Sequence, residues 1–389
     1  MPSPRPFACA VTDAAIEDLH RRIDNARWPD ALDGVGWDYG MPPEPLRELM
    51  RYWRHDFCWR TAEARLNALD QFKLGIDGLD THFIHQRSPH PHALPLLLVH
   101  GWPGSVVEFL DVVPRLTEPE RFGGRAEDAF HVVCPSLPGY GFSEAARAPG
   151  MGPHGAAGRF LQLMAALGYD RFVAQGGDWG STVVHFLAGL APERLIGMHL
   201  NMLPPWRPRD IEDPQALMTP AERDRYAADV ARREEVTGYQ AIQRTRPQTL
   251  AYGLADSPVG LAAWIGEKLW AWSDNAGDLR EALSFDKALT NISLYWFTNT
   301  IGSSIRFYRE FAQDYAQGKK PLARRGVPTA AAFYPREIEG AVRAWSERQY
   351  DLVRWFAPER GGHFAAFEQP EVFAADLWAF AEVLKNAVR

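Results

Sequence analysis

The chain has 389 residues, of which 46% are hydrophobic and 23% are charged, and its formal net charge is −7. This length suits one large domain with an insertion, or two domains. The acidic balance argues against a nucleic acid or an anionic membrane surface as a partner. The 14 tryptophans and 21 phenylalanines favour an apolar or aromatic pocket.

The cysteines and the apolar runs indicate the cellular compartment of the protein. Cys9, Cys58 and Cys134 have no motif spacing, which argues against a disulfide framework and against a zinc site. Sparse cysteines of this kind predict a reducing compartment, the cytoplasm. The start MPSPRPFACA has no basic region followed by an apolar run, so we expect no signal peptide. No stretch approaches about 18 apolar residues, so we also expect no membrane span.

The first 90 residues predict a mostly helical segment. Apolar periodicity and proline breakers place three helices and one strand, at Ile16–Arg27, Leu46–Trp53, Thr61–Phe72 and His82–Gln86. The string SPHPHALP that follows is a loop by its prolines.

Short apolar strands then alternate with helices. The expected strands are Leu96–Val99, Phe130–Cys134 and Phe172–Gln175, and the expected helices are Gly158–Leu167 and Ser181–Leu190. The strands are followed in turn by the strings HGWPG, PSLPGYGFS and GGDWG. Such alternation predicts a parallel sheet covered on both faces, with its ligand at the carboxyl ends of the strands. All three strings fall at such ends.

The alternation stops between residues 203 and 325, where helical patterns rich in tryptophan and tyrosine predict a helical cap inserted into the sheet domain. It resumes with a strand at Pro328–Phe333 and ends with a helix at Val372–Val383. We therefore expect an N-terminal segment at 1–90 that packs on the core, a core at 91–202 and 326–389, and a cap at 203–325.

Asp178 is the candidate nucleophile. It is the central residue of GGDWG, which has the spacing of a nucleophile elbow, the strand-to-helix turn that usually carries serine. The alternative is an ordinary helix N-cap, which the position between a strand and a helix disfavours. A carboxylate is anionic at neutral pH and can displace at a saturated carbon to leave an ester on the enzyme. That chemistry suits an epoxide or an alkyl halide and suits a simple carboxyl ester poorly.

The second step of such a reaction needs an oxyanion hole and a base. The backbone N–H groups of Trp102 and Trp179 are placed to form the hole, although HGWPG could also be an ordinary turn. His363, on a glycine-rich loop before the last helix, is the candidate base. Glu337, at the end of a strand, is the candidate acid that orients it. Asp351 and Glu359 compete for that role.

These strings resemble the epoxide hydrolases of the microsomal type, a branch that includes insect juvenile hormone epoxide hydrolases and many soluble bacterial members. The similarity runs from about Phe7 to near the C-terminus, and HGWPGS, PSLPGYGFS, GGDWGS and RGGHFAAFEQPE carry it. It implies an α/β-hydrolase fold with a mostly parallel central sheet, an inserted helical cap and an N-terminal helical and meander segment. Tyr334 stands where the family has a phenylalanine before the acid. Membrane-bound members carry an N-terminal anchor, which this sequence lacks, so the resemblance does not extend to membrane association.

The resemblance also implies two cap tyrosines that protonate the opening epoxide oxygen. Tyr239 in GYQAIQ and Tyr308 in SIRFYRE match the two motifs. Four further tyrosines are competing candidates: Tyr226, Tyr252, Tyr295 and Tyr315.

We therefore expect an epoxide hydrolase that forms a vicinal diol with no cofactor and no metal. Its partners would be a small epoxide and water, in detoxification or in secondary metabolism, and a homodimer stays open. The alternatives are a haloalkane dehalogenase, which shares the aspartate and histidine but needs no tyrosine pair, and a catalytically silent binding protein of the same fold. An esterase is disfavoured because the elbow carries no serine.

Overall fold

The computed structural model describes residues 3–322 and 326–386. Within these ranges nine strands form one sheet, in the order β1-β2-β3-β5-β4-β6-β7-β8-β9. The strands are β1 (Arg5–Phe7), β2 (Gln71–Ile76), β3 (Leu79–Gln86), β4 (Leu94–Val99), β5 (Phe130–Pro135), β6 (Phe172–Gly176), β7 (Leu195–Leu200), β8 (Pro328–Ala332) and β9 (Asp351–Phe356).

The sheet is parallel from β5 through β9 and antiparallel only at the β1–β3 edge. This confirms the expected mostly parallel sheet. In the register, Val99 lies opposite Gly176, so β4 and β6 end at the same level. The loops after β4, β6 and β8 therefore open on one edge of the sheet, which is where a ligand binds in such folds.

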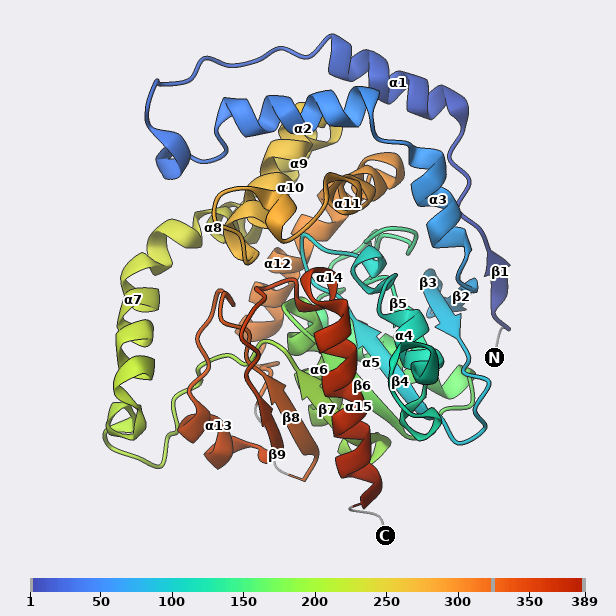
Figure 1. The fold of residues 1–389 in the computed structure, drawn as a ribbon, viewed down its shortest axis with the longest axis vertical. Helices are drawn as coiled ribbons and strands as arrows, with labels where there is room; N and C mark the ends of the chain where they lie inside the picture. Colours follow the sequence, from blue (N-terminus) through green and yellow to red (C-terminus); the bar gives the residue numbers. More distant parts are fainter. Residues whose placement is uncertain (1–2, 323–325, 387–389) are drawn as a thin grey trace.

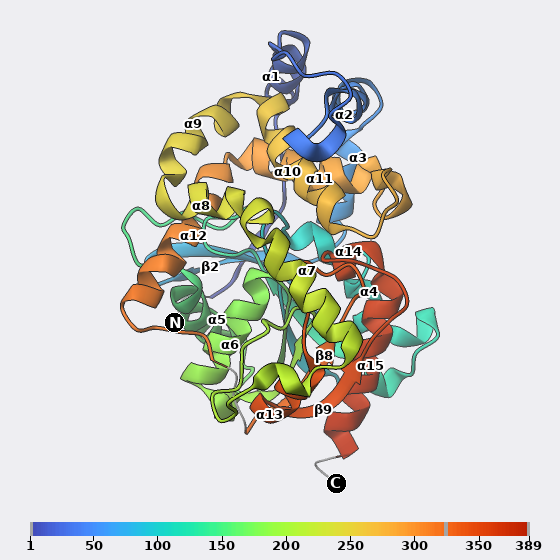
Figure 2. The same ribbon diagram turned by 90° about the vertical axis from the view of Figure 1, so that its left-hand side faces the viewer.

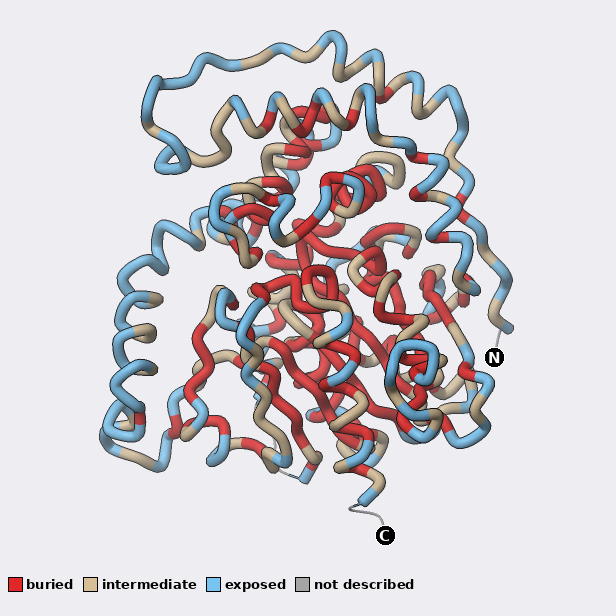
Figure 3. Tube along the Cα trace, viewed as in Figure 1, coloured by how far each residue is buried: buried red, intermediate tan, exposed pale blue. Residues whose placement is uncertain are grey.

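Helices cover both faces of the sheet, as the buried apolar strands require. On one face lie α5 (Pro153–Ala166) and α6 (Trp179–Leu190); on the other lie α4 (Val113–Thr117) and α15 (Pro370–Asn386). Figure 2 shows the sheet edge-on between these two layers. The strand residues between them form the red centre of Figure 3.

A group of helices lies across the carboxyl edge of the sheet (Figure 1). It consists of α7 (Pro220–Val236), α8 (Gly238–Thr245), α9 (Pro247–Asp256), α10 (Pro258–Trp272), α11 (Phe285–Thr298) and α12 (Ile301–Ala316). We call this group the cap. Helix α7 contains no buried residue and runs down the side of the molecule (Figure 3), whereas α10 and α11 are mostly buried.

The N-terminal helices pack on the cap, whereas strands β1, β2 and β3 of the same segment extend the sheet. The helices are α1 (Asp13–Asp24), α2 (Pro43–His55) and α3 (Trp59–Asn67), and they contact α10 and α11. A buried hydrogen bond of 2.9 Å from Trp53 Nε1 to Ser293 Oγ joins α2 to α11. Among the described residues, no helix combines the length and the apolar character needed to cross a membrane.

One predicted helix is present but ends earlier than expected. The helix expected at Thr61–Phe72 ends at Asn67, and Gln71–Ile76 is strand β2. All residues of β2 pair with β3, from Gln71 opposite Ile84 to Ile76 opposite Leu79. Tertiary pairing therefore overrides a local helical pattern. Strands β1, β7 and β9 and the short helix α13 (Arg343–Gln349) were not anticipated either.

Candidate active site

Asp178 lies on a tight turn between β6 and α6. Its φ of 48° and ψ of −124° are unusual for a residue with a side chain, and such backbone strain is concentrated at functional sites. A Cβ on Gly176 would lie 2.2 Å from the backbone of Gly180, and a Cβ on Gly180 would lie 2.0 Å from the carbonyl oxygen of Val99. The flanking glycines are therefore required by close approach of the backbone.

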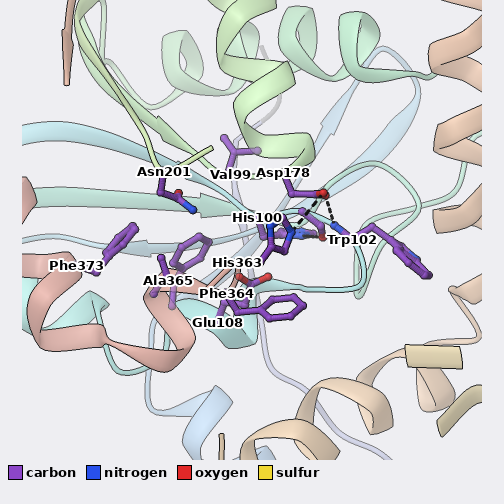
Figure 4. A pocket seen from close by; sticks show the side chains of 14 residues that line it. Val99, His100, Trp102, Glu108, Asp178, Asn201, His363, Phe364, Ala365 and Phe373 are labelled. Atoms are coloured by element: carbon purple, nitrogen blue, oxygen red, sulfur yellow. Dashed lines mark hydrogen bonds and ion pairs between the residues drawn. The ribbon is translucent and has the colours of Figure 1, made fainter. Parts of the chain in front are cut away.

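The Asp178 carboxylate faces the loop after β4. Its Oδ1 accepts a hydrogen bond of 2.7 Å from the backbone N–H of Trp102 (Figure 4), and its side chain makes no N-cap hydrogen bond to α6. This geometry therefore disfavours the alternative that Asp178 serves only as the N-cap of α6. Among the hydrogen bonds of the described residues, none joins the Trp179 N–H to this carboxylate.

His363 bridges the two candidate carboxylates. Its Nε2 lies 3.5 Å from Asp178 Oδ2, and its Nδ1 lies 2.6 Å from Glu337 Oε1. The side chains of His363 and Glu337 are only 2% and 1% exposed. The backbone N–H of His363 donates to the carbonyl of Trp272 in the cap at 2.8 Å. The histidine loop is therefore held from both sides of the site.

Glu337, and not its two competitors, is the partner of His363. It follows β8, and its Oε1 also accepts the N–H of Ile338 at 2.7 Å. Asp351 instead lies at the start of β9, where it accepts the N–H of Gly326, and Glu359 is exposed.

The two carboxylates set the charge of the imidazole. Burial opposes a charged His363, but the negative charges of Glu337 and Asp178 and their hydrogen bonds outweigh burial and raise the pKa of His363 well above its usual value. With Asp178 ionised, the protonated imidazole is favoured. Loss of the charge on Asp178 would remove part of that support and lower the pKa of His363.

Tyr239 on α8 and Tyr308 on α12 line the same cavity as Asp178, from the side of the cap. Both are buried, and their rings lie 5.8 Å apart. Tyr239 stacks on the indole of Trp102 at 5.4 Å, and Tyr308 meets the indole of Trp179 edge-on at 4.7 Å. Burial, followed by other contributions that include the charge of Asp178, raises the pKa of both phenols. Both are therefore protonated at neutral pH.

Of the other four candidate tyrosines, Tyr315 alone lines the same cavity as Tyr239 and Tyr308. Tyr295 is buried and donates to the carbonyl of Gly104, Tyr252 is largely exposed, and Tyr226 accepts hydrogen bonds from Arg207. Tyr315 lies further along α12 and is 51% exposed.

A cavity of about 340 Å³ opens between Asp178 and the two tyrosines. Its remaining lining is mainly apolar and includes Trp179, Met202, Phe311 and Ile338. The polar residues of that lining are Thr182, Gln240, Arg244 and Glu339. A larger cavity of about 530 Å³ lies between α7, α10 and the Glu337 loop, and it also reaches Tyr239. Four of the seven predicted site residues, Asp178, Trp179, Tyr239 and Tyr308, therefore line one substrate-sized space.

Known proteins match this chain along almost its whole length. A family described as "Epoxide hydrolase N terminus" matches residues 4–109, and one described as "alpha/beta hydrolase fold" matches residues 95–369. A Stigmatella aurantiaca (strain DW4/3-1) protein named "Putative epoxide hydrolase" is 47% identical, over 96% of this chain and 83% of its own length. The chain belongs to the epoxide hydrolase family.

Two further relatives agree with this assignment. Epoxide hydrolase 1 of Sus scrofa is 39% identical, over 98% of this chain and 89% of its own length. The crystal structure of juvenile hormone epoxide hydrolase from the silkworm Bombyx mori superposes with a TM-score of 0.92 at 32% identity, over 100% of this chain and 96% of that chain. The similarity predicted from the motifs is thus confirmed, as is the α/β-hydrolase fold.

Sequence reasoning missed several residues of this epoxide hydrolase site. Glu368 accepts the backbone N–H groups of Asp274, Gly362 and Phe364, and so fixes the histidine loop. Glu108 lines a small cavity beside Asp178 and His363. The available signals were an acid among apolar residues in VVEF and another in HFAAFE.

Proposed function

We propose that this epoxide hydrolase converts an apolar epoxide to a vicinal diol in two steps, through an ester formed on Asp178. The observation that carries the proposal is the position of one carboxylate between His363, 3.5 Å away, and a cavity that two buried phenols also line. A nucleophile, a base and two proton donors then act on one substrate carbon and its oxygen.

In the first step, an oxygen of Asp178 attacks an epoxide carbon and the strained carbon–oxygen bond breaks. An alkoxide is a poor leaving group in an apolar site, so the departing oxygen takes a proton from the Tyr239–Tyr308 pair. The ring packing of both tyrosines supports this assignment, because it aims them at the same cavity as Asp178. The products of the step are an alkyl ester of Asp178 and one phenolate.

In the second step, water attacks the ester carbonyl and His363 takes one of its protons. Glu337 orients the imidazole and stabilises its positive charge. The Trp102 N–H, which already donates to Oδ1 at 2.7 Å, stabilises the oxyanion, and we assign a second donation to the Trp179 N–H. The ester bond then breaks, the imidazolium protonates the leaving diol oxygen, and the proton of the new carboxyl restores the tyrosine.

The cavity supports a bulky apolar or aryl epoxide as substrate. Its volume of about 340 Å³ is at the lower end of small-molecule sites. Aromatic and aliphatic side chains form most of its wall, so an apolar substituent would be buried there without losing hydrogen bonds.

Isotope labelling under single-turnover conditions tests the mechanism. With enzyme in excess in heavy-oxygen water, the first diol should take its new oxygen from Asp178 and carry no label. Many turnovers in the same water should label the diol, which is the positive control. Label in the first diol would exclude the ester.

One observation favours a second reaction, dehalogenation of an alkyl halide. The indole Nε1 atoms of Trp102 and Trp179 are buried without a hydrogen-bond partner among the described residues. Such donors suit a halide leaving group, which needs no proton. Halide release from a chloroalkane, measured against diol formation from the matching epoxide, separates the two activities, and we expect the diol to dominate.

We also propose a cytoplasmic location, supported by the sparse cysteines without motif spacing. Light scattering coupled to size-exclusion chromatography measures the molar mass in solution and so distinguishes a monomer from a homodimer.

A further inference from the structure

A second, much smaller cavity touches Asp178 but not the tyrosines. Its volume of about 20 Å³ corresponds to roughly one water molecule. Figure 4 shows its lining, in which the polar side chains are Asp178, His363, His100, Asn201 and Glu108. It is therefore a polar, water-sized space on a face of the nucleophile that the substrate cavity does not use.

A water molecule in this cavity would lie beside both groups that hydrolysis of the ester needs. Such a water needs a line to the Asp178 carboxyl carbon and an acceptor for one proton at His363 Nε2, and both groups line the cavity. Its second hydrogen needs another acceptor, because an unpaired O–H in a buried site would cost free energy.

The other polar side chains have their acceptors engaged. His100 donates from Nδ1 to the Gly101 carbonyl at 2.9 Å and accepts the Leu137 N–H at Nε2 at 3.1 Å. Asn201 Oδ1 accepts from Gln175 at 2.7 Å. Glu108 is left as the acceptor for the second hydrogen.

The chain is built to bring Glu108 to this place. It belongs to the short helical turn Val106–Phe109 directly after HGWPG, with apolar neighbours on both sides. A Cβ on Gly104 would lie 1.5 Å from Glu108 Oε1, so the carboxyl fills the space that Gly104 leaves open. Only glycine at that position allows the carboxyl to reach the cavity.

We propose that Glu108 binds the attacking water together with His363, and so aligns it for hydrolysis of the Asp178 ester. The inference rests on the two-step mechanism proposed above and assigns Glu108 to its second step alone. Epoxide ring opening occurs in the cavity of about 340 Å³ that Tyr239 and Tyr308 line, which Glu108 does not reach.

The protonation state of Glu108 fits this task. Burial, supported by the charges of Asp178 and Glu368 and opposed by His363 and the Ser105 N–H, raises its pKa to about 8. At neutral pH the carboxyl is mostly neutral, so it does not repel Asp178. Its carbonyl oxygen still accepts a hydrogen bond from water.

Separate measurement of the two steps tests the proposal. Glu108→Leu removes the acceptor and keeps much of the volume, whereas Glu108→Gln keeps a carbonyl acceptor and is the matched control. Ring opening is followed by quenching of tryptophan fluorescence under single-turnover conditions, and the ester is followed by intact-protein mass spectrometry. We expect Glu108→Leu to slow ester hydrolysis by about 10- to 100-fold, the loss of roughly one hydrogen bond to the reacting water. Ring opening should stay within about twofold, and Glu108→Gln should hydrolyse the ester within about fivefold of wild type.

The His363→Gln variant separates failure of the Glu108 role from failure of the two-step mechanism. His363→Gln should accumulate the ester; if no ester forms even there, the two-step mechanism itself fails. If His363→Gln accumulates ester and Glu108→Leu hydrolyses it at the wild-type rate, only the role of Glu108 is wrong. Equal slowing of both steps in Glu108→Leu would also overturn it, because that result indicates general distortion of the site. Should the leucine variant not fold, Glu108→Met, which is unbranched and of similar length, takes its place.

Discussion

The active site has two halves that hold their functional groups by different means. In the core half, Asp178, His363 and Glu337 stand on loops of the sheet and are joined by short polar contacts of 2.6 to 3.5 Å. In the cap half, Tyr239 and Tyr308 stand on helices α8 and α12 and are held mainly by rings at 4.7 to 5.8 Å.

This difference follows from charge. A buried carboxylate or imidazolium is costly unless hydrogen bonds and an opposite charge compensate it, so the core half is a closed polar chain. A phenol is neutral at the pH of catalysis, so ring packing is enough to orient it and its O–H stays available for a substrate. Substitutions in the core half should therefore abolish a step, whereas substitutions in the cap half should weaken one by degrees.

The largest effect should come from Asp178→Asn, which keeps the shape of the side chain and removes the nucleophilic charge. We expect diol formation to fall by about 10⁴-fold or more, since a catalytic group that acts as part of a unit is lost. The matched control is Asp351→Asn, the same change at the start of β9 outside the cavities, which should retain ester formation. A variant at position 178 that still forms a covalent ester would contradict the assignment of the nucleophile.

Glu337→Gln should have the next largest effect and should also change the pH profile. The negative charge of Glu337 helps to raise the pKa of His363, so removing it lowers that pKa. The base form of His363 then persists to lower pH. We expect ester hydrolysis to slow by about 10³-fold, with the acid limb of its rate–pH profile moved to lower pH.

The limb is measured by single-turnover hydrolysis of the preformed ester between pH 5 and about 9. A limb that moved to higher pH would show that Glu337 does not support the charged imidazole.

In the cap half, Tyr239→Phe and Tyr308→Phe each leave one proton donor. We expect each to slow ring opening by about 10- to 100-fold and the double variant by more than either alone. Ester hydrolysis should change little, and fluorescence and mass measurements on the same samples resolve the two steps. Tyr252→Phe, at an exposed position outside the cavity, is the control. If the double variant opened epoxides at the rate of the single ones, the pair would not share the leaving oxygen.

The core half was largely predictable from the sequence because its geometry is local. The strings HGWPG, GGDWG and RGGHF fix their loops at the ends of strands, so Trp102, Asp178 and His363 could be named before the fold was known. The cap tyrosines needed a family resemblance, since six of the twelve tyrosines lie in the cap helices and look alike until the helices pack.

The remaining features depend on contacts between distant segments. Strand β2 forms because β3 is available to pair with it, which no local pattern reveals. The Trp272 carbonyl supports the histidine loop through a backbone hydrogen bond. Any residue type could make this bond, so the sequence does not indicate it. Glu108 has a sequence signal, but its cavity exists only after Gly104 and the histidine loop have come together.

The smallest effect concerns Lys268, a cation in the cap that lies over the ring of Tyr239. The Nζ of Lys268 lies 4.6 Å from the ring centre of Tyr239 and 5.7 Å from that of Trp272, and its side chain is 9% exposed. A cation over the ring holds it in place and favours the phenolate that forms during ring opening. Glu267 pairs with Lys268 and offsets part of this charge, so the expected effect is modest.

Lys268→Met keeps the length of the side chain and removes its charge, while Lys268→Arg keeps the charge. We expect the methionine variant to slow ring opening by about 3- to 10-fold, the equivalent of roughly 1 kcal/mol, and the arginine variant to stay closer to wild type. Single-turnover fluorescence measures the rate, and thermal unfolding checks that both variants are folded. Equal losses in the two variants would mean that Lys268 acts only by filling space. In that case ring packing alone would orient the tyrosines of the cap half. The difference from the core half, which is held by charges and hydrogen bonds, would then be larger than the contacts indicate.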